Sequence, residues 1–379
     1  MRFWIVGGGT GGHVYPALAV AQALQAGAPD VAGGAPDAGG TPHASTWVGS
    51  VDGMEAELVA RAGLPFIGIP AGGLHGVALL NAVRSGWQLT RGTFAALHHL
   101  RRERPDAILT TGGYVAGPVA VAAAWQHVPI LVYLPDIEPA QSVKALARLA
   151  TRIGVTVEDS RAFLPAEKVV VTGYPLGERI TRWSRVAGRK ALALPLDDLV
   201  LLVFGGSRGA RSINRALLAQ LPALTEVAHV VHVSGELDWP EVSAARETLP
   251  EDVKAHYHAY AYLHDEMGAA MAAADLVVCR AGASILGEFP YFGLPAILVP
   301  YPHAWRYQKV NAAWLANRGA AVVVDDAALL AQLAPKARAL LLDAPRREAM
   351  AAAARALARP DAARRLAELL TQIASPKEG

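Results

Sequence analysis

The sequence predicts an α/β fold with two Rossmann-like domains, each a doubly wound parallel sheet, facing across a cleft. Two glycine-rich loops carry this prediction. Gly7–His13 (GGGTGGH) follows the apolar run Phe3–Val6, and Gly205–Ala210 (GGSRGA) follows Leu199–Phe204. A chain of 379 residues is too long for one ordinary core. Strand-like and helix-like segments alternate in both halves, which is typical of parallel sheets with right-handed crossovers.

Short apolar runs predict the strands of the first half. These strands are Arg2–Val6, Thr46–Gly49, Phe66–Ile69, Ala107–Thr110 and Ile130–Leu134. The predicted helices are Val14 to about Ala26, Met54–Arg61, Ala78–Arg102, Gly117–Gln126 and Gln141–Ala150. Residues 27–45 are dominated by Gly, Ala and Pro and predict a flexible surface loop.

A second series of strands begins near Leu199. It comprises Leu199–Phe204, Val227–Val233, Val253–His258, Leu276–Cys279, Ala296–Val299 and Ala321–Val324. Gly293 and Gly319 are helix stop signals between them. The segment Thr172–Pro175 is a turn signal after three valines and predicts the domain junction. The tail from about Pro345 is helical, and Asp361 is expected to cap a last helix, Ala362–Ile373.

Composition excludes several classes of protein. Apolar residues make up 53% of the chain and charged residues 18%, so disorder over most of its length is excluded. The net charge is +2 and no basic stripe is interleaved with aromatics, so no nucleic-acid partner is expected. The single cysteine, Cys279, ends an apolar run and is expected to be a buried strand-end residue.

No secretory signal or membrane-spanning helix is expected. The apolar run after Arg2 is too short for a signal peptide. The uncharged stretch 107–135 is interrupted by Gly112, Pro118 and Pro129, which favours strand, turn, helix and strand over a span.

Each glycine loop is suited to hold a phosphate, because its backbone N–H groups and the positive end of the next helix point to one place. Two such loops predict an enzyme that joins two diphosphate-bearing substrates. Gly7, Gly9 and Gly12 also match the dinucleotide fingerprint. An NAD site also needs an acidic residue about 20 positions after the loop. The candidate in this sequence, Asp52, lies about forty positions after the loop. A tight turn without a ligand is the remaining alternative.

His13 is expected in the first turn of the helix after the first loop. That position favours the neutral imidazole and lowers its pKa. A neutral imidazole can accept a proton from a substrate hydroxyl, so His13 is a candidate general base. The alternative is a helix cap that only orients a phosphate.

Two further segments follow strand ends, where open α/β sheets bind ligands. Arg280–Glu288 (RAGASILGE) predicts a turn of small residues and a helix that carries Glu288. A carboxylate there can accept hydrogen bonds from both hydroxyls of a ribose. The simpler interpretation is a helix-dipole partner. The second segment is Val299–Asn311 (VPYPHAWRYQKVN).

Together these motifs resemble the MurG family, the UDP-N-acetylglucosamine (UDP-GlcNAc) transferases of peptidoglycan synthesis, which have the GT-B fold. The resemblance also includes Trp47–Val59, Thr111–Pro118 (TGGYVAGP), Asp265–Met267 and Asp275–Cys279. It implies an N-terminal domain, 1–175, that holds the lipid acceptor and is joined by the C-terminal helix, about 360–379. Residues 176–359 would bind UDP-GlcNAc.

The resemblance also implies roles for individual residues. The acceptor, undecaprenyl-diphosphate-linked muropeptide (lipid I), would contact Gly9, Thr10, Gly11, Gly12, His13 and Tyr114. UDP-GlcNAc would contact Gly206, Ser207, Arg208, Gly209, His264, Gly282, Ala283, Glu288 and Gln308. The backbone of His264 would meet the uracil, and Tyr307 replaces the first of the family's paired glutamines.

Three departures concern mainly the acceptor side. Pro135–Pro139 (PDIEP) stands where the family has His-Glu-Gln-Asn, so only an acid is kept. Gly173–Gly177 (GYPLG) lacks the arginine of the family's Gly-Asn-Pro-x-Arg, and Arg179 or Arg182 is a candidate replacement. The third departure is the insert at 27–45.

The implied reaction is direct displacement at the anomeric carbon of GlcNAc by the C4 hydroxyl of MurNAc, with inversion. The candidate catalytic groups are His13 and an acid at 136–138, Asp136 first among them. No metal or other cofactor is expected, since no Asp-x-Asp motif follows a strand.

A lipid acceptor implies a peripheral protein at the cytoplasmic face of the cell membrane. Residues 74–104 combine apolar and basic side chains, which suits an anionic membrane surface. The apolar residues are Leu74, Val77, Leu79, Leu80 and Trp87, and the basic ones are Arg84, Arg91, Arg101, Arg102 and Arg104. An ordinary amphipathic helix with a solvated face is the alternative.

Other functions stay open on the sequence alone. A UDP-GlcNAc 2-epimerase would need no acceptor, and a related transferase would use another lipid such as a diacylglycerol. A scaffold that only binds sugar nucleotides, and an NAD-dependent dehydrogenase, are less favoured because the loops look complete for a diphosphate-linked sugar.

Overall fold

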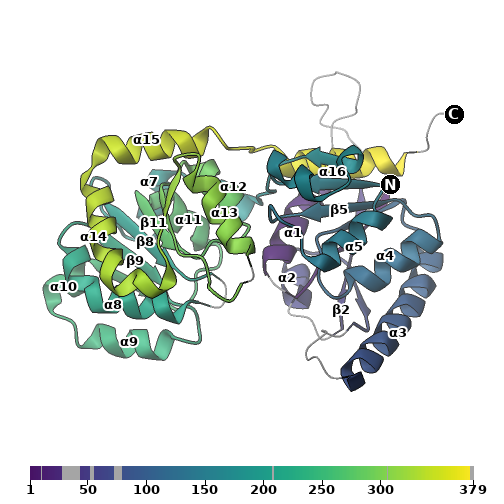
Figure 1. Cartoon of the computed structure of the whole chain (residues 1–379), viewed down its shortest axis with the longest axis horizontal. Helices are drawn as coiled ribbons and strands as arrows, with labels where there is room; N and C mark the ends of the chain where they lie inside the picture. Colours follow the sequence, from purple (N-terminus) through teal and green to yellow (C-terminus); the bar gives the residue numbers. More distant parts are fainter. Residues whose placement is uncertain are drawn as a thin grey trace. The chain divides into compact units, whose positions relative to one another are not determined.

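A computed structural model gives the fold (Figure 1). It describes residues 1–9, 11–27, 43–51, 55–71, 79–206, 209–304 and 306–375, with only the backbone of 79–86 and 88. The chain forms two compact units. Unit 1 is Met1–Gly177 with Pro360–Gly379, and unit 2 is Glu178–Arg359.

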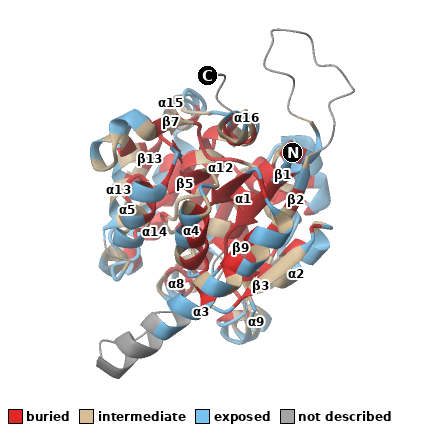
Figure 2. Cartoon of the chain, turned by 90° about the vertical axis from the view of Figure 1, so that its right-hand side faces the viewer, coloured by how far each residue is buried: buried red, intermediate tan, exposed pale blue. Residues whose placement is uncertain are grey.

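Unit 1 contains a parallel sheet of seven strands in the order β3-β2-β1-β4-β5-β6-β7. Its strands are β1 (Arg2–Val6), β2 (Ala44–Ser50), β3 (Phe66–Ile69), β4 (Ala107–Thr110), β5 (Ile130–Leu134), β6 (Arg152–Val155) and β7 (Val169–Val171). The central strands are buried on both faces, which explains their continuous apolar character (Figure 2).

Helices cover both faces of this sheet, with one contribution from the end of the chain. The helices are α1 (Gly11–Gln25), α2 (Glu55–Arg61), α3 (Leu79–Glu103), α4 (Ala116–Trp125), α5 (Gln141–Leu149) and α16 (Ala362–Ala374), with short 3₁₀ turns η1 (Glu158–Phe163) and η2 (Ala166–Lys168). The last helix, α16, packs against α1 and places Leu366 and Leu370 in the core of unit 1 (Figure 1).

Unit 2 contains a parallel sheet of six strands in the order β10-β9-β8-β11-β12-β13. They are β8 (Val200–Phe204), β9 (His229–Val233), β10 (Tyr257–Tyr260), β11 (Leu276–Cys279), β12 (Ala296–Leu298) and β13 (Ala321–Val323). The helices are α6 (Glu178–Thr181), α7 (Arg185–Ala191), α8 (Arg211–Thr225), α9 (Trp239–Glu247), α10 (Glu251–Ala255), α11 (Glu266–Ala273), α12 (Ile285–Phe292), α13 (Tyr307–Ala316), α14 (Leu329–Leu342) and α15 (Ala344–Arg355), with a 3₁₀ turn η3 (Asp326–Ala328).

The two parallel sheets with intervening helices confirm the predicted fold class, and most boundaries differ by one or two residues. The strands β6 and β7 were not predicted, because runs of three or four residues carry little periodicity. The strand predicted at Val253–His258 is wrong at its start. Pro250, Glu251 and Asp252 begin the helix α10 instead, since proline and acids favour a helix N-terminus.

The prediction that Asp361 caps the last helix is also wrong, because its side chain makes a different contact. Asp361 stands at the N-terminus of α16, but its side chain caps no backbone N–H. Its carboxylate accepts from Arg365 Nε at 2.6 Å and from Arg364 at 3.4 Å. Gly293, in contrast, ends α12 in the left-handed conformation with φ 63°, as a stop signal should.

Each sheet changes direction once along its strand order. In unit 1 the change lies between β1 and β4, and in unit 2 it lies between β8 and β11. Loops that leave neighbouring strands at such a point diverge to opposite faces and leave a crevice at the carboxyl edge. Both glycine-rich loops of the sequence lie at these two points.

Candidate functional site

The first glycine loop is interlocked with the loop after β4. Val6 and Thr110 are paired at the ends of β1 and β4. The Thr111 hydroxyl donates to the carbonyl of His13 at 2.8 Å, and Trp47 Nε1 donates to the carbonyl of Gly7 at 3.1 Å. The two loops therefore form one rigid surface at the carboxyl edge of unit 1.

Two glycines show why this surface needs residues without side chains. Gly113 has φ +92°, and a Cβ atom there would lie 2.6 Å from the carbonyl oxygen of Gly8. Gly9 has φ +86°, and no described residue beyond its two chain neighbours has an atom within 4 Å of the place a Cβ would take. The Cβ side of Gly9 is therefore open, while Gly113 allows the two loops to touch.

A buried carboxylate is hydrogen-bonded to the backbone of the first loop. Glu55, the first residue of α2, is 1% exposed. Its Oε1 accepts from the Ser50 N–H at 2.8 Å, and its Oε2 accepts from the Gly9 N–H at 3.4 Å. Sequence analysis missed this residue, because an acid at a helix start is typical of a dipole partner and its loop contact is tertiary.

The imidazole of His13 lies beside the loop after β4. A Cβ atom on Gly112 would be 3.4 Å from His13 Nε2. Burial lowers the pKa of His13, and the nearby charge of Asp136 and a hydrogen bond with the backbone of Gly8 partly oppose this. The imidazole is therefore neutral near pH 7, and Asp136, which follows β5, is its acidic neighbour.

The other acceptor-side residues lie near this edge. Gly11 is buried at the start of α1 and Gly12 is exposed. Tyr114 is 50% exposed and follows the interlocked glycines. Thr10 lies outside the described residues.

The second glycine loop shows the same division between open and packed glycines. Gly206 has φ +94°, and no described residue beyond its chain neighbours has an atom within 4 Å of its Cβ position. Gly209 has φ +76°, and a Cβ there would lie 2.3 Å from the carbonyl oxygen of Ser234. Gly206 therefore presents its backbone to open space, and Gly209 lets the loop rest on the end of β9. Ser207 and Arg208 lie outside the described residues.

The helix after this loop is anchored by a buried polar network. Asn214 Nδ2 donates to the carbonyl of Ser234 and to Asp238 Oδ2, both at 2.9 Å. Asn214 Oδ1 lies 3.0 Å from His232 Nε2, and His232 Nδ1 lies 2.7 Å from the hydroxyl of Tyr257. This network holds the N-terminal half of α8 against β9 and its following loop.

A second polar cluster joins the segments after β11 and β13 to the first turn of α8. Arg280, after β11, pairs with Asp326, after β13, and its Nη2 donates to Ser212 Oγ at 2.8 Å. Ser212 Oγ in turn donates to Asp326 Oδ1 at 2.7 Å. Asp326 was not predicted as a site residue, since only the tertiary fold brings η3 next to α8.

Glu288 is buried in α12, below the turn of small residues that ends β11. Burial raises the pKa of its carboxyl, and the Ser284 hydroxyl and the charge of Arg179 act in the opposite direction. In the turn before α12, no described residue beyond the two chain neighbours of Gly282 has an atom within 4 Å of its Cβ position, and Ala283 is half-buried. The turn is therefore open on the Cβ side of Gly282.

Gln308 connects the loops after β11 and β12. Its Oε1 accepts from the N–H groups of Tyr301 at 2.8 Å and Ala281 at 3.3 Å. Asn311, fully buried one turn later, donates from Nδ2 to the carbonyl of Ala281 at 3.2 Å. The side-chain oxygen of Gln308 thus holds these two loops together.

His264 is exposed just before α11, and its ring lies 4.8 Å from that of Tyr262. Cys279 is fully buried, and burial raises the pKa of its thiol, as expected of a strand-end residue without reactivity.

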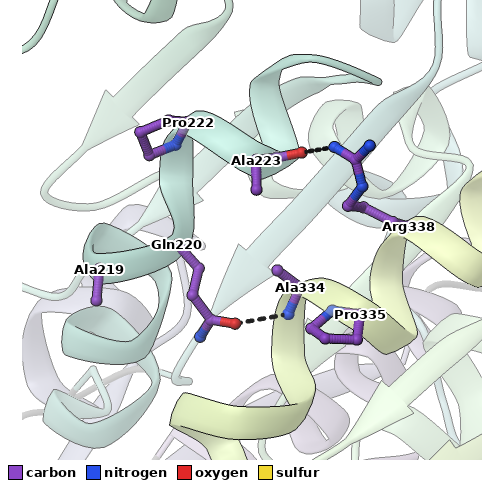
Figure 3. A pocket seen from close by; sticks show the side chains of 7 residues that line it. All are labelled: Ala219, Gln220, Pro222, Ala223, Ala334, Pro335 and Arg338. Carbon is purple, nitrogen blue, oxygen red and sulfur yellow. Dashed lines mark hydrogen bonds between the residues drawn. The ribbon is translucent and has the colours of Figure 1, made fainter.

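A hollow of about 550 Å³ lies elsewhere, between the C-terminal half of α8 and α14 (Figure 3). In it, Gln220 Oε1 accepts from the Ala334 N–H at 3.0 Å, and Arg338 donates to the carbonyl of Ala223. None of the predicted site residues lines it, since the glycine loop is at the opposite end of α8. The hollow is therefore separate from the site at the carboxyl edge.

The predicted membrane-facing helix is described in part. Leu74 and Val77 lie outside the described residues, and the side chains of Leu79, Leu80 and Arg84 are not described. Trp87 and Phe94, seven residues apart on α3, are 64% and 63% exposed. Arg91, Arg101, Arg102 and Arg104 are also exposed. None of the helices in the described ranges has the length and apolar character to cross a membrane.

Comparison with known proteins decides the family. The glycosyltransferase family 28 N-terminal domain matches residues 3–155 and its C-terminal domain matches residues 200–366. The transferase of Roseiflexus sp. (strain RS-1) is 46% identical, over 98% of this chain and 95% of that protein. This chain belongs to glycosyltransferase family 28.

The printed name of the Roseiflexus family member is UDP-N-acetylglucosamine--N-acetylmuramyl-(pentapeptide) pyrophosphoryl-undecaprenol N-acetylglucosamine transferase. A protein of the same name from Desulforudis audaxviator (strain MP104C) is 38% identical over 99% of both chains. These full-length matches confirm the resemblance to the MurG family stated from the motifs.

Solved structures agree with the fold of the family. The crystal structure of Acinetobacter baumannii MurG has a TM-score of 0.73 and 27% identity, over 98% of this chain and 99% of that chain. The UDP-GlcNAc 2-epimerase from Neisseria meningitidis has a TM-score of 0.67 at 16% identity, over 98% and 100% of the two chains. The second likeness concerns the fold alone, so the epimerase alternative has weaker support than the transferase.

Proposed function

We propose that this protein transfers GlcNAc from UDP-GlcNAc to the C4 hydroxyl of MurNAc in lipid I, which yields lipid II for peptidoglycan synthesis. The observation that carries the proposal is 46% identity along nearly the whole chain to a transferase of that name. The two open glycine loops, one in each unit, supply a phosphate-binding surface for each substrate.

In this proposal unit 2 binds the donor. The diphosphate lies over the backbone of Gly206, with Ser207, Arg208 and Gly209 beside it. The unsatisfied N–H groups at the start of α8 stabilise the charge that grows on UDP as it leaves. Glu288 accepts from the ribose hydroxyls, and the backbone of His264 meets the uracil.

The sugar of the donor is held between two turns of the same edge. Gly282 and Ala283 leave space for it, and the amide nitrogen of Gln308 donates to a sugar hydroxyl. Gln308 is suited to this because its oxygen is already bound to the Ala281 and Tyr301 backbone, which fixes the direction of the amide.

Unit 1 binds the acceptor. The diphosphate of lipid I lies over Gly9, Thr10, Gly11 and Gly12, with Tyr114 at the rim. His13 is neutral at pH 7 and removes the proton from the C4 hydroxyl, while Asp136 stabilises the imidazolium that results.

The protein is proposed to act at the cytoplasmic face of the membrane as a peripheral protein. Lipid I is anchored in the bilayer, and the exposed Trp87 and Phe94 of α3, beside Arg91, form a surface suited to anionic headgroups. We call these three residues the α3 patch.

Turnover of UDP-GlcNAc with three acceptors tests the proposal. We expect UDP release with a soluble lipid I analogue, and no release with a diacylglycerol or without an acceptor. Conversion of UDP-GlcNAc to another sugar nucleotide in the absence of acceptor would instead identify an epimerase. Preference for diacylglycerol would identify a transferase with a different lipid acceptor, as the altered Pro135–Pro139 segment allows.

A further inference from the structure

We propose that Arg179 is a positioning residue of the donor site, which fixes the backbone of His264 and carries its charge near Glu288. The inference rests on the proposed function, since it takes these two residues to hold the uracil and the ribose. It also selects one of two arginines, Arg179 and Arg182, that follow the Gly173–Gly177 turn.

The first argument is the contact with His264. Arg179 lies on α6, the short helix at the start of unit 2, and its Nη1 donates to the carbonyl of His264 at 3.3 Å. The same carbonyl accepts from the Met267 N–H in the first turn of α11, at 3.4 Å. A peptide held from both sides cannot rotate freely, so the groups of His264 that meet a base keep one orientation.

The second argument is that α6 itself is fixed. It packs on α11, and a Cβ atom on Gly268 would lie 2.8 Å from the carbonyl oxygen of Arg179. Trp183 Nε1 donates both to that carbonyl, at 3.2 Å, and to the carbonyl of Asp265, at 3.1 Å. The backbone of Arg179 is therefore tied to the start of α11, which follows the His264 carbonyl that its guanidinium binds.

The third argument is charge. Glu288 can accept from both ribose hydroxyls only as a carboxylate. Burial raises the pKa of Glu288, and the Ser284 hydroxyl and the positive charge of Arg179 lower it. Arg179 therefore favours the form of Glu288 that binds a ribose.

Within the part of the chain that the structure describes, the other ionisable groups around α12 do not supply this charge. The Cys279 thiol on β11 is neutral, because burial and the charge of Glu288 raise its pKa. Arg280 is paired with Asp326. Arg355, on α15, packs at the far end of α12, against Gly293. On α11, the neighbour on the other side, the acid Glu266 is exposed in the first turn.

Arg182 has a different environment although it is only three residues away. It pairs with Asp265 at 3.5 Å, and the two side chains are 52% and 61% exposed. Its guanidinium lies 5.0 Å from the ring of Trp183. A surface pair of this kind contributes little to stability or binding, so Arg182 is the matched control.

Titration of the full-length protein with UDP tests the inference without an acceptor. We expect Arg179→Met, which keeps an unbranched apolar stem but removes the charged guanidinium, to raise the Kd for UDP about tenfold. Arg179→Lys should recover part of the loss, and Arg182→Met should stay within about twofold of the wild type, as a surface pair should. Thermal unfolding of each variant shows whether it is folded.

The pH profile separates positioning from a merely structural role. Without Arg179 the pKa of Glu288 rises, so UDP binding by Arg179→Met should weaken at a higher pH than binding by the wild type. A structural defect would raise Kd by the same factor at every pH, and that result would overturn the inference.

Two further outcomes are decisive. Equal UDP binding by the wild type and Arg179→Met, or an equal loss in Arg182→Met, would overturn the role of Arg179 while leaving the proposed function intact. A wild-type protein that binds no UDP would overturn both the inference and the proposed function.

Discussion

At the scale of single residues, the proposed base and its acidic neighbour are the central pair. His13 is held beside Gly112 with a lowered pKa, and Asp136 lies close enough to oppose that shift. An imidazole acts as a base only when it is neutral. Because the pKa of His13 is lowered from the ordinary value of 6.5, the wild-type rate should stay constant as the pH falls to somewhat below 6.5 and should decrease only at still lower pH.

Substitution of each residue should separate their roles. If His13 is the base, His13→Gln should lower kcat by about 10²–10⁴-fold. Asp136→Asn should have a smaller effect and, because the negative charge raises the pKa of His13, should move the acid limb of the pH–rate profile to lower pH. Steady-state kinetics with a soluble lipid I analogue measure both effects.

The opposite pattern would identify a different base. Near-normal turnover in His13→Gln together with a large loss in Asp136→Asn would assign the proton transfer to the carboxylate. UDP binding serves as the control for both variants, because neither residue belongs to unit 2, which is proposed to bind the donor.

At the scale of elements, polar clusters hold the strand ends and helix starts of unit 2 together. The cluster of Arg280, Asp326 and Ser212 ties β11, η3 and α8 to one another. The glycine loop stands between β8 and α8, so its shape depends on where α8 begins. Polar contacts of this kind fix that position more narrowly than apolar packing does.

Removing the acid of this cluster should destabilise unit 2. Asp326→Ala leaves the charge of Arg280, which is only 10% exposed, without its partner. We expect a loss of about 1–3 kcal/mol in the free energy of unfolding. Urea unfolding of the full-length protein measures it.

An exposed pair between α8 and α9 provides the control. Arg215 and Glu241 are 60% and 48% exposed, so Glu241→Ala should cost no more than about 1 kcal/mol. An equal loss of unfolding free energy in Asp326→Ala and Glu241→Ala would show that the buried cluster contributes no more to stability than the exposed pair.

The α3 patch makes a prediction about membranes. Trp87 and Phe94 are apolar and exposed, with Arg91 between them on the helix. Replacing both aromatic residues by serine should weaken binding to phosphatidylglycerol vesicles at least about tenfold, because two aromatic side chains can no longer enter the bilayer interface. Co-sedimentation with vesicles is the measurement.

An exposed apolar residue in unit 2 is the matched control. Leu237 is 69% exposed but lies far along the sequence from α3. Leu237→Ser should leave vesicle binding unchanged. Equal binding by the wild type and the Trp87→Ser/Phe94→Ser variant would show that the α3 patch does not contact membranes.

At the scale of the whole molecule, the stability of the protein should depend on pH through histidines in unit 2. His229 lies 3.1 Å from His258 and 3.2 Å from Asp198, at the edge of the sheet opposite the glycine loop. Burial lowers the pKa of both histidines, that of His258 to about 4. The folded state therefore prefers neutral imidazoles, and the unfolded state takes up protons first as the pH falls.

The direction of the pH effect follows from these shifts. Their contribution to stability is complete above the ordinary pKa of 6.5 and is lost as the pH falls from there towards about 4. The thermal midpoint of the wild type should fall in that window, and His258→Gln should lose less over it. Parallel curves for the two proteins would contradict this origin of the pH dependence.

The sequence alone determined the fold class, the two glycine loops and the family, because these depend on local patterns. Apolar runs define buried parallel strands, and a glycine-rich turn between a strand and a helix has few other uses. The sequence did not predict the short strands β6 and β7, since three or four residues carry too little periodicity. It also did not predict the start of β10, because Pro250–Asp252 favours a helix.

The tertiary structure decided which polar residues act together. Glu55 under Gly9, Asp326 beside Arg280, and Arg179 on the carbonyl of His264 are pairs separated by tens of residues, and no local pattern marks their partners. A hydrogen bond depends on distance and direction in space, and the order of strands in the sheets sets both. Local sequence preferences predict the helices and strands of this chain, but only the packing of these elements determines which side chains form its site.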